Sequence, residues 1–198
     1  MATVKPNFWQ NNNVEPKRGY RFILSIQGGT STSDSTGFSE WLIKNVKKPS
    51  FAINPTAHNY LNHTFHYPGR VTWNECSFVI VDTVNPGANA SEQLMKLLEE
   101  SGYELPTVPS TAAFRTTVSK AAASAALGQV YIKTLNAIGE EVERWVLNNA
   151  WIKSADFGSY DYTTEDLQQV TIGLQYDNAY IAIQGGNTFP TTPGVNVP

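Results

Sequence analysis

The chain has one cysteine, Cys76, among its 198 residues, and it has few charged side chains. A single cysteine cannot form an internal disulfide, which argues against a small secreted domain held together by disulfides. No run of 18 or more apolar residues occurs, so we expect no membrane-spanning helix, and the first residues lack the apolar segment of a signal peptide. The net charge of −3 argues against a basic nucleic-acid-binding protein.

The residues that are abundant favour β structure. Aromatic residues make up 12% of the chain, and charged residues make up only 16%, compared with roughly 25% in soluble domains. Aromatic side chains pack well on pleated surfaces, while the 14 glycines and 11 prolines supply turns. The composition therefore predicts a mainly β protein, and the length predicts one domain.

Alternation of apolar and polar residues locates the strands. The period of two is clear from Tyr20 to Ile26 and clearest from Leu167 to Tyr176. The segment 73–82 is apolar on both faces around Phe78, which predicts a strand buried on both sides. Further strands are expected at 41–47 and 58–68, and a hairpin is expected from 130–135 and 142–151 around the turn 136–139.

One helix is expected shortly after these first strands. Asn89 and Glu92 have the spacing of a capping box, and three leucines follow at positions i, i+3 and i+4 to form one apolar stripe. Gly102 suits the left-handed position that ends a helix. The alanine-rich segment 119–127 fits either a short helix or a linker.

The sequence shows no pattern of a catalytic or metal site. His58, His63 and His66 lie within nine residues, but on one strand only His58 and His66 would share a face. No cysteine or acidic ligand lies among them, which disfavours metal binding. Cys76 lies in an apolar strand, where a thiol acts as a small apolar group rather than as a nucleophile. We therefore expect no enzyme activity, no metal and no cofactor.

The composition divides the chain into three parts. Residues 1–18 form a polar arm whose large apolar side chains are Phe8 and Trp9. Residues 19–184 contain the expected strands and the helix, and residues 185–198 are rich in Gly, Pro and Thr, which is typical of a flexible tail. Exposed rings on a polar arm are typical of a segment that docks on a partner.

The order of four segments resembles a known family. They are the strand 16–26 behind the arm, the strand 72–81 ahead of the helix, Val142–Trp151 with its two tryptophans, and Val170–Asp177. Over about residues 14–180, this order and hydrophobic texture resemble those of the tail tube proteins of contractile-tailed (myovirus-type) bacteriophages. The Gly/Ser-rich loop, the alanine-rich stretch and the tail after Tyr180 depart from that pattern.

The resemblance implies two packed antiparallel sheets, in a sandwich or barrel-like tail-tube fold, with a flanking helix. It implies that six copies form a ring whose strands complete an inner barrel, and that rings stack into a hollow tube that conducts DNA during genome ejection. The implied partners are the tail sheath protein, a baseplate tube initiator, a tape-measure protein and a tail terminator, with DNA passing through without sequence-specific binding. The implied location is the virion tail, after assembly in the host cytoplasm.

Two sets of residues are candidates for contacts in such a tube. The arm and the loop 28–39 would serve as adapters between copies, and the acidic residues, whose negative charge opposes DNA adhesion, would face the lumen or a neighbouring ring. Ordinary solvated loops remain an equal interpretation of the acidic residues. A tube of a related secretion or injection machine, and a β-sandwich baseplate or binding module, remain alternatives for the whole chain. The contact candidates are Phe8, Trp9, Ser31, Asp34 and Phe38, and the lumen or ring-face candidates are Glu140, Glu141, Glu143, Asp156 and Asp161.

Overall fold

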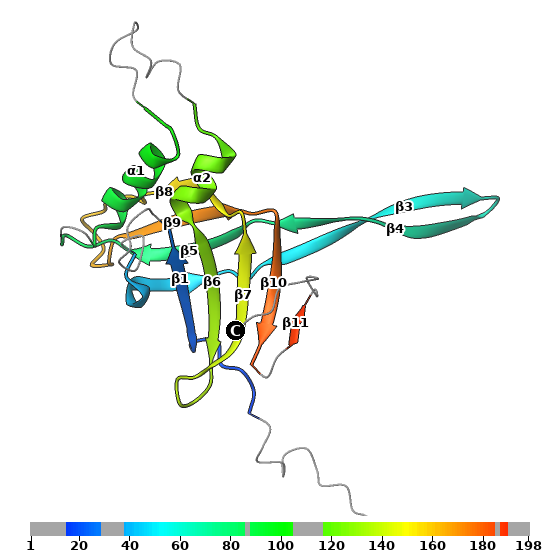
Figure 1. The fold of residues 1–198 in the computed structure, drawn as a ribbon, viewed down its shortest axis with the longest axis horizontal. Helices are drawn as coiled ribbons and strands as arrows, with labels where there is room; N and C mark the ends of the chain where they lie inside the picture. The colour runs from blue at the N-terminus through cyan, green and yellow to red at the C-terminus, as the bar shows by residue number, and fades with distance from the viewer. Residues whose placement is uncertain (1–14, 29–37, 86–87, 105–116, 185–186, 190–198) are drawn as a thin grey trace, which may run out of the picture.

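The computed structural model describes residues 15–28, 38–85, 88–104, 117–184 and 187–189 (Figure 1). Its helices are α1 (Ala90–Glu100), α2 (Lys120–Leu127) and the short 3₁₀ helix η2 (Glu40–Leu42). Its strands are β1 (Phe22–Gln27), β2 (Ile43–Val46), β3 (Ser50–Tyr60), β4 (His63–Asn74), β5 (Cys76–Val81), β6 (Gln129–Leu135), β7 (Glu141–Asn148), β8 (Trp151–Asp156), β9 (Gln169–Gln175), β10 (Asn178–Ile183) and β11 (Asn187–Phe189).

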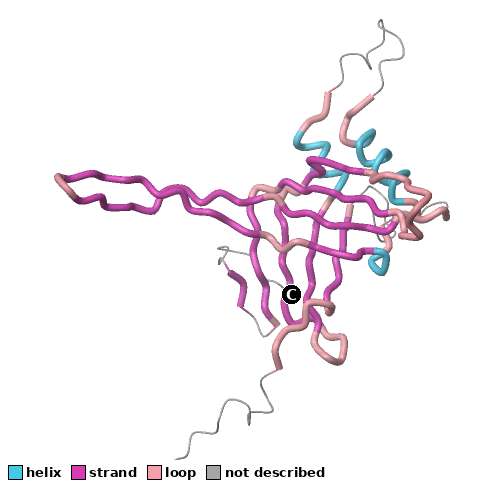
Figure 2. Tube along the Cα trace, turned by 180° about the vertical axis from the view of Figure 1, so that it is seen from behind, coloured by secondary structure: helices cyan, strands magenta, loops and turns pink. Residues whose placement is uncertain are grey.

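Two antiparallel sheets form the body of the protein. One sheet has the strand order β1-β6-β7-β10-β11 and the other β2-β5-β9-β8. Strands β3 and β4 pair with each other as a separate two-stranded ribbon, which extends away from the body (Figures 1 and 2). The expected mainly β fold with two packed sheets is confirmed, and a second helix joins the expected one.

The hydrophobic core lies between the two sheets because each sheet turns one apolar face inward. Cys76, Phe78 and Ile80 alternate with half-buried residues along β5 and are at most 2% exposed. Ile172 of β9 is the cross-strand partner of Phe78, and Leu147 of β7 reaches the same cluster from the other sheet. Full burial of one such side chain contributes about 1.5–3 kcal/mol, so this layer dominates the stability of the fold.

Both α-helices begin at side-chain caps. Asn89 caps α1 by accepting a hydrogen bond from the backbone N–H of Glu92, which confirms the expected start. The alanine-rich segment forms α2, whose cap is Ser119. Gly128 ends α2 with φ +68, where an added Cβ would lie 1.8 Å from the backbone oxygen of Gln27, so a glycine is required there. No helix in the described ranges is both long and apolar enough to cross a membrane.

The predicted strand at 58–68 is not one strand, because a turn divides it between β3 and β4. The chain instead reverses at Leu61 and Asn62, so that β3 and β4 form one long hairpin in which Tyr60 faces His63. Both strands are exposed on both faces over nearly their whole length, so neither has the core-facing side that an isolated half-buried strand would have. The predicted strand at 73–82 is likewise divided, since β4 ends at Asn74 and β5 begins at Cys76.

Three further features differ from the expectation. The predicted strand at 142–151 breaks at Asn149, whose φ of +52 turns the chain from β7 in one sheet to β8 in the other. Strand β5 is buried on one face and only half-buried on the other, whereas both faces were expected to be buried. The tail expected to be flexible from residue 185 contributes β11, which pairs with β10, while residues 190–198 lie outside the described part.

Replacing Ile172 with Ala is expected to lower the free energy of unfolding by about 2–5 kcal/mol, because the side chain is fully buried and its loss leaves a cavity. The matched control is Thr171→Ala, an exposed neighbour on the same strand, which is expected to change stability by less than about 1 kcal/mol. Urea unfolding followed by circular dichroism measures both. Equal losses in the two variants would contradict the assigned core face of β9.

Candidate self-assembly surfaces

The β3–β4 hairpin carries many of the exposed large apolar side chains in the described part of the chain. Every residue from Phe51 to Thr72 is exposed, although a two-stranded ribbon alone is marginally stable in water. Contiguous exposed apolar surface of this kind marks an interaction site. The large apolar side chains on it are Phe51, Ile53, Tyr60, Leu61, Phe65, Tyr67 and Val71.

The pairing register divides these side chains between the two faces of the hairpin. Near the body, Phe51 and Ile53 lie on one face with their partners on β4. Toward the tip, the other face carries Tyr60, Phe65 and Tyr67, since Phe65 and Tyr67 pair with residues of β3 that have the same parity as Tyr60. Both faces therefore present rings, at different distances from the body.

The root of the hairpin is attached to the body by aromatic contacts. Trp73 packs against Phe51 with ring centroids 5.5 Å apart, and it packs against Tyr176 of the core at 6.0 Å. Such pairs contribute about 0.5–1.5 kcal/mol beyond the area they bury. The hairpin thus projects from a fixed base.

Glu143 joins the arm and the hairpin root to the five-stranded sheet. Its side chain is 5% exposed and accepts hydrogen bonds from Lys17, from Lys48 at 3.0 Å and from the Trp145 indole at 2.7 Å. Burial alone would raise the pKa of Glu143, but these three donors outweigh it and lower the pKa to about 2. Lys17 lies at the end of the arm and Lys48 lies two residues before β3, so one carboxylate holds the bases of both appendages.

The three histidines all lie on the hairpin, but not in the arrangement expected for one strand. His58 pairs with Phe65, and His63 pairs with Tyr60, which places His58 and His63 on one face and His66 on the other. In the described residues, no group of three or more His, Cys, Asp or Glu side chains could hold a metal ion.

Among the expected contact residues, Phe8, Trp9, Ser31 and Asp34 lie outside the described residues. Phe38 is buried in the core, where its ring meets Phe78 edge-to-face at 6.3 Å. It is therefore unavailable for a contact between copies, because packing against the sheet already covers it.

The structure does not gather the five acidic candidates into one patch. Glu140 and Glu141 lie at the β6–β7 turn, where Glu141 forms two hydrogen bonds with Arg144 at 2.7 and 2.9 Å. Glu143 is buried beneath its lysines. Asp156 ends β8, and Asp161 lies in the β8–β9 connection, where hydrogen bonds from the backbone and hydroxyl of Thr163 lower its pKa. Their negative charge is thus divided between two regions of the molecule, and part of it is neutralised.

A surface groove near Trp41 was missed by the sequence analysis. Trp41 belongs to a segment expected as a strand, but the 3₁₀ helix η2 leaves its side chain 83% exposed. The groove, of about 510 Å³, lies between η2, β2 and the β8–β9 connection, and Leu167 in that connection is also exposed. A signal was present in the acidic, aromatic composition of residues 156–166, but which apolar residue lies beside them depends on the tertiary fold.

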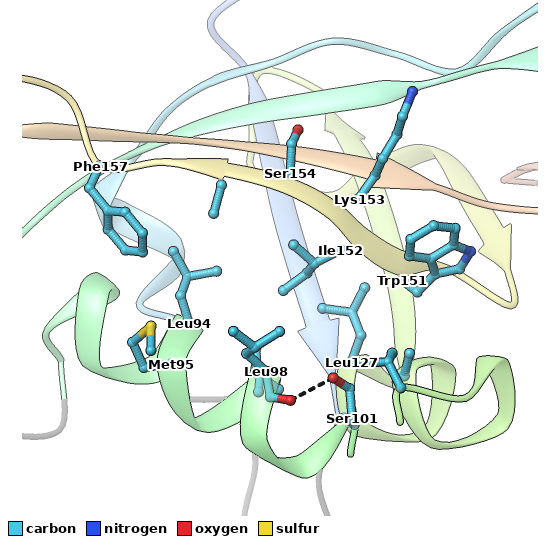
Figure 3. Close-up of a pocket in the computed structure, with 15 residues that line it drawn as sticks. Leu94, Met95, Leu98, Ser101, Leu127, Trp151, Ile152, Lys153, Ser154 and Phe157 are labelled. Atoms are coloured by element: carbon cyan, nitrogen blue, oxygen red, sulfur yellow. Dashed lines mark hydrogen bonds between the residues drawn. The ribbon is translucent and has the colours of Figure 1, made fainter. Parts of the chain in front are cut away.

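A second apolar groove, of about 390 Å³, lies between α1, α2 and β8. Leu94, Leu98 and Ile152 point toward one another within it, whereas Lys153 points away (Figure 3). The hydroxyl of Ser101 donates a hydrogen bond to the backbone oxygen of Leu98 at 2.6 Å. The described lining of this groove is mainly apolar and contains no histidine, cysteine or carboxylate.

The chain is similar in fold to chains in solved structures of contractile injection systems. The chain is similar to one in the anti-feeding prophage baseplate, with a TM-score of 0.61 and 13% identity, covering 85% of this chain and 97% of that one. It is similar to a chain of the anti-feeding prophage tube-terminating cap, with a TM-score of 0.57 and 19% identity, covering 86% of this chain and 93% of that one. It is also similar to a chain in the sheath-tube complex of the extracellular contractile injection system PVC, with a TM-score of 0.56 and 19% identity, covering 90% of this chain and 99% of that one. No protein-family model and no curated protein matches the chain. The likenesses show a fold that occurs in the tubes, caps and baseplates of these machines.

Glu143→Gln is expected to destabilise the protein by about 1–3 kcal/mol at pH 7, because two lysines and an indole lose a charged acceptor. The pKa of Glu143 is lowered on folding, so its contribution is fully present above its unfolded pKa of about 4.3 and is lost as pH falls toward 2. The difference between wild type and variant in urea unfolding should therefore shrink from pH 5 to pH 2.

The matched control is Glu140→Gln. Its carboxylate accepts a hydrogen bond from Asn136 at an exposed turn, so little change is expected at either pH. A pH-independent loss in Glu143→Gln would show that the ionised carboxylate is not what holds the two appendages.

Proposed function

We infer that this protein is a structural subunit of a hollow tube in a contractile tail or injection machine. The observation that carries the proposal is the exposed aromatic hairpin on a sandwich fold shared with components of such machines. Covering the exposed part of each apolar side chain would contribute on the order of 1 kcal/mol. In a ring or a stack of rings, a neighbouring copy of the chain would bury these apolar side chains.

The edges of the larger sheet support ring formation. Strands β1 and β11 are the outer strands of the five-stranded sheet in the described chain. A head-to-tail contact between the β1 edge of one copy and the β10–β11 edge of the next would continue the sheet from copy to copy. If the rotation between copies closes, as the proposal requires for six, the sheets form one barrel without free edges.

The cargo of the tube has two candidates. The resemblance to myovirus tail tubes favours a conduit for phage DNA within a sheath, built on a baseplate initiator around a tape-measure protein. The likeness to the prophage cap and to the PVC sheath-tube complex favours a tube of an injection machine. The neighbouring genes discriminate between them: capsid and portal genes support the DNA conduit, and their absence beside sheath and baseplate genes supports the injection machine.

Replacing residues 54–70 with an Asn-Gly turn is expected to leave the body folded but to abolish assembly. The turn joins Ile53 and Val71, which are cross-strand partners, and the removed residues contribute nothing to the core. The thermal midpoint should stay within a few degrees of wild type. Sedimentation and negative-stain microscopy should show monomers where wild type forms rings or tubes.

The control is the double variant Asn59→Ser and Thr64→Ser, which changes polar hairpin residues and retains the rings. It should assemble like wild type. Assembly of the truncated protein into normal tubes would remove the hairpin from the mechanism, and compact wild-type monomers at high concentration would favour a binding module instead of a tube.

A further inference from the structure

The tip of the hairpin holds a leucine in an unfavourable backbone conformation. Leu61 has φ +49, a left-handed conformation that glycine and asparagine adopt far more readily. Its side chain is 86% exposed, so no contact within the described molecule compensates for the strain. Leu61 thus combines backbone strain with an exposed apolar side chain at the tip of the hairpin. This combination indicates that the residue contacts another molecule.

The Trp41 groove lies at the opposite end of the molecule from the hairpin tip (Figure 1). Trp41 and Leu167, 83% and 70% exposed, line it together with the carboxylates of Glu165 and Asp166 and with the ammonium group of Lys44. The hairpin and the β8–β9 connection lie at opposite ends of the longest axis (Figures 1 and 2). The tip therefore cannot enter the groove of its own molecule.

The hairpin carries no negative charge that the acidic β8–β9 connection would repel. Residues 50–74 contain Arg70 and the three histidines but no Asp or Glu. The β8–β9 connection, 157–168, contains three carboxylates and no Lys or Arg. A hairpin without carboxylates meets no like-charge repulsion on this surface, whereas an acidic hairpin would.

We propose that the hairpin tip of one copy, led by Leu61, docks in the Trp41–Leu167 groove of a second copy. This proposal rests on the proposed function and identifies the contact that joins successive copies along the tube. The contact is heterologous, since a hairpin on one end meets a groove on the other, and it leaves the first copy with a free groove and the second copy with a free hairpin. It can therefore repeat without limit, as a stack of rings requires.

The first test uses Leu61→Asn and Trp41→Ser. Asparagine suits the left-handed turn position, so Leu61→Asn should leave the thermal midpoint unchanged or slightly raised. Loss of the leucine anchor should nevertheless raise the protein concentration needed for assembly by roughly ten- to a hundred-fold, measured by sedimentation. Trp41→Ser should weaken assembly similarly, and Asn62→Ser, the neighbouring tip residue, is the matched control with no effect expected.

The second test maps the contact by cross-linking. Asn62→Cys combined with Lys44→Cys places thiols beside the tip and in the groove, while the native Cys76 is buried and its pKa is raised to about 11, so it stays unreactive. A short bis-maleimide should yield a ladder of covalent multimers on a denaturing gel. Asn62→Cys combined with Ala137→Cys, at the β6–β7 turn, should yield none.

The outcomes separate the docking surface from the proposed function. Weakened assembly of both anchor variants, with a ladder only for the tip–groove pair, supports the proposal. Wild-type tubes with normal assembly of Leu61→Asn, or a ladder that is as strong for the control pair, overturn the docking surface and leave the tube subunit standing. Wild-type protein that forms no assembly at any concentration overturns both.

Discussion

The constraint on which the structure depends is that a two-stranded ribbon cannot cover its own side chains. The sandwich buries one face of each sheet against the other, and its strands obey the usual alternation of buried and exposed residues. The β3–β4 hairpin has no such opposing layer, and its rings and aliphatic side chains remain in water. In the proposed tube, a second copy of the chain would cover these side chains.

The body of the protein is organised to hold this hairpin in place. At the root of the hairpin, the ring of Trp73 packs against Phe51 and against the core residue Tyr176. Glu143, buried on the inner face of the larger sheet, binds one lysine from the arm and another from the segment before β3. Because the Glu143 carboxylate binds a lysine at the base of the arm and another at the base of the hairpin, both bases are held at one point of the five-stranded sheet. This is the sheet that is proposed to form the barrel.

Sequence patterns predicted the elements that have a core beside them. Strand β9, the β6–β7 hairpin and the capped helix α1 follow from alternation, turn residues and capping, which are local signals. The β3–β4 hairpin was missed because its strands face water on both sides. The strand boundary at Asn149 was missed because it depends on which sheet the chain enters next. Glu143 was expected in a lumen or at a ring face, since nothing near it in sequence reveals that Lys17 and Lys48 lie over it.

The most direct measurement is a cryo-EM reconstruction of the full-length protein at high concentration. The account predicts hollow tubes of stacked six-membered rings in which every β3–β4 hairpin is covered by a neighbouring copy. Solitary molecules with a bare hairpin, or tubes in which the hairpins remain in solvent, would contradict it.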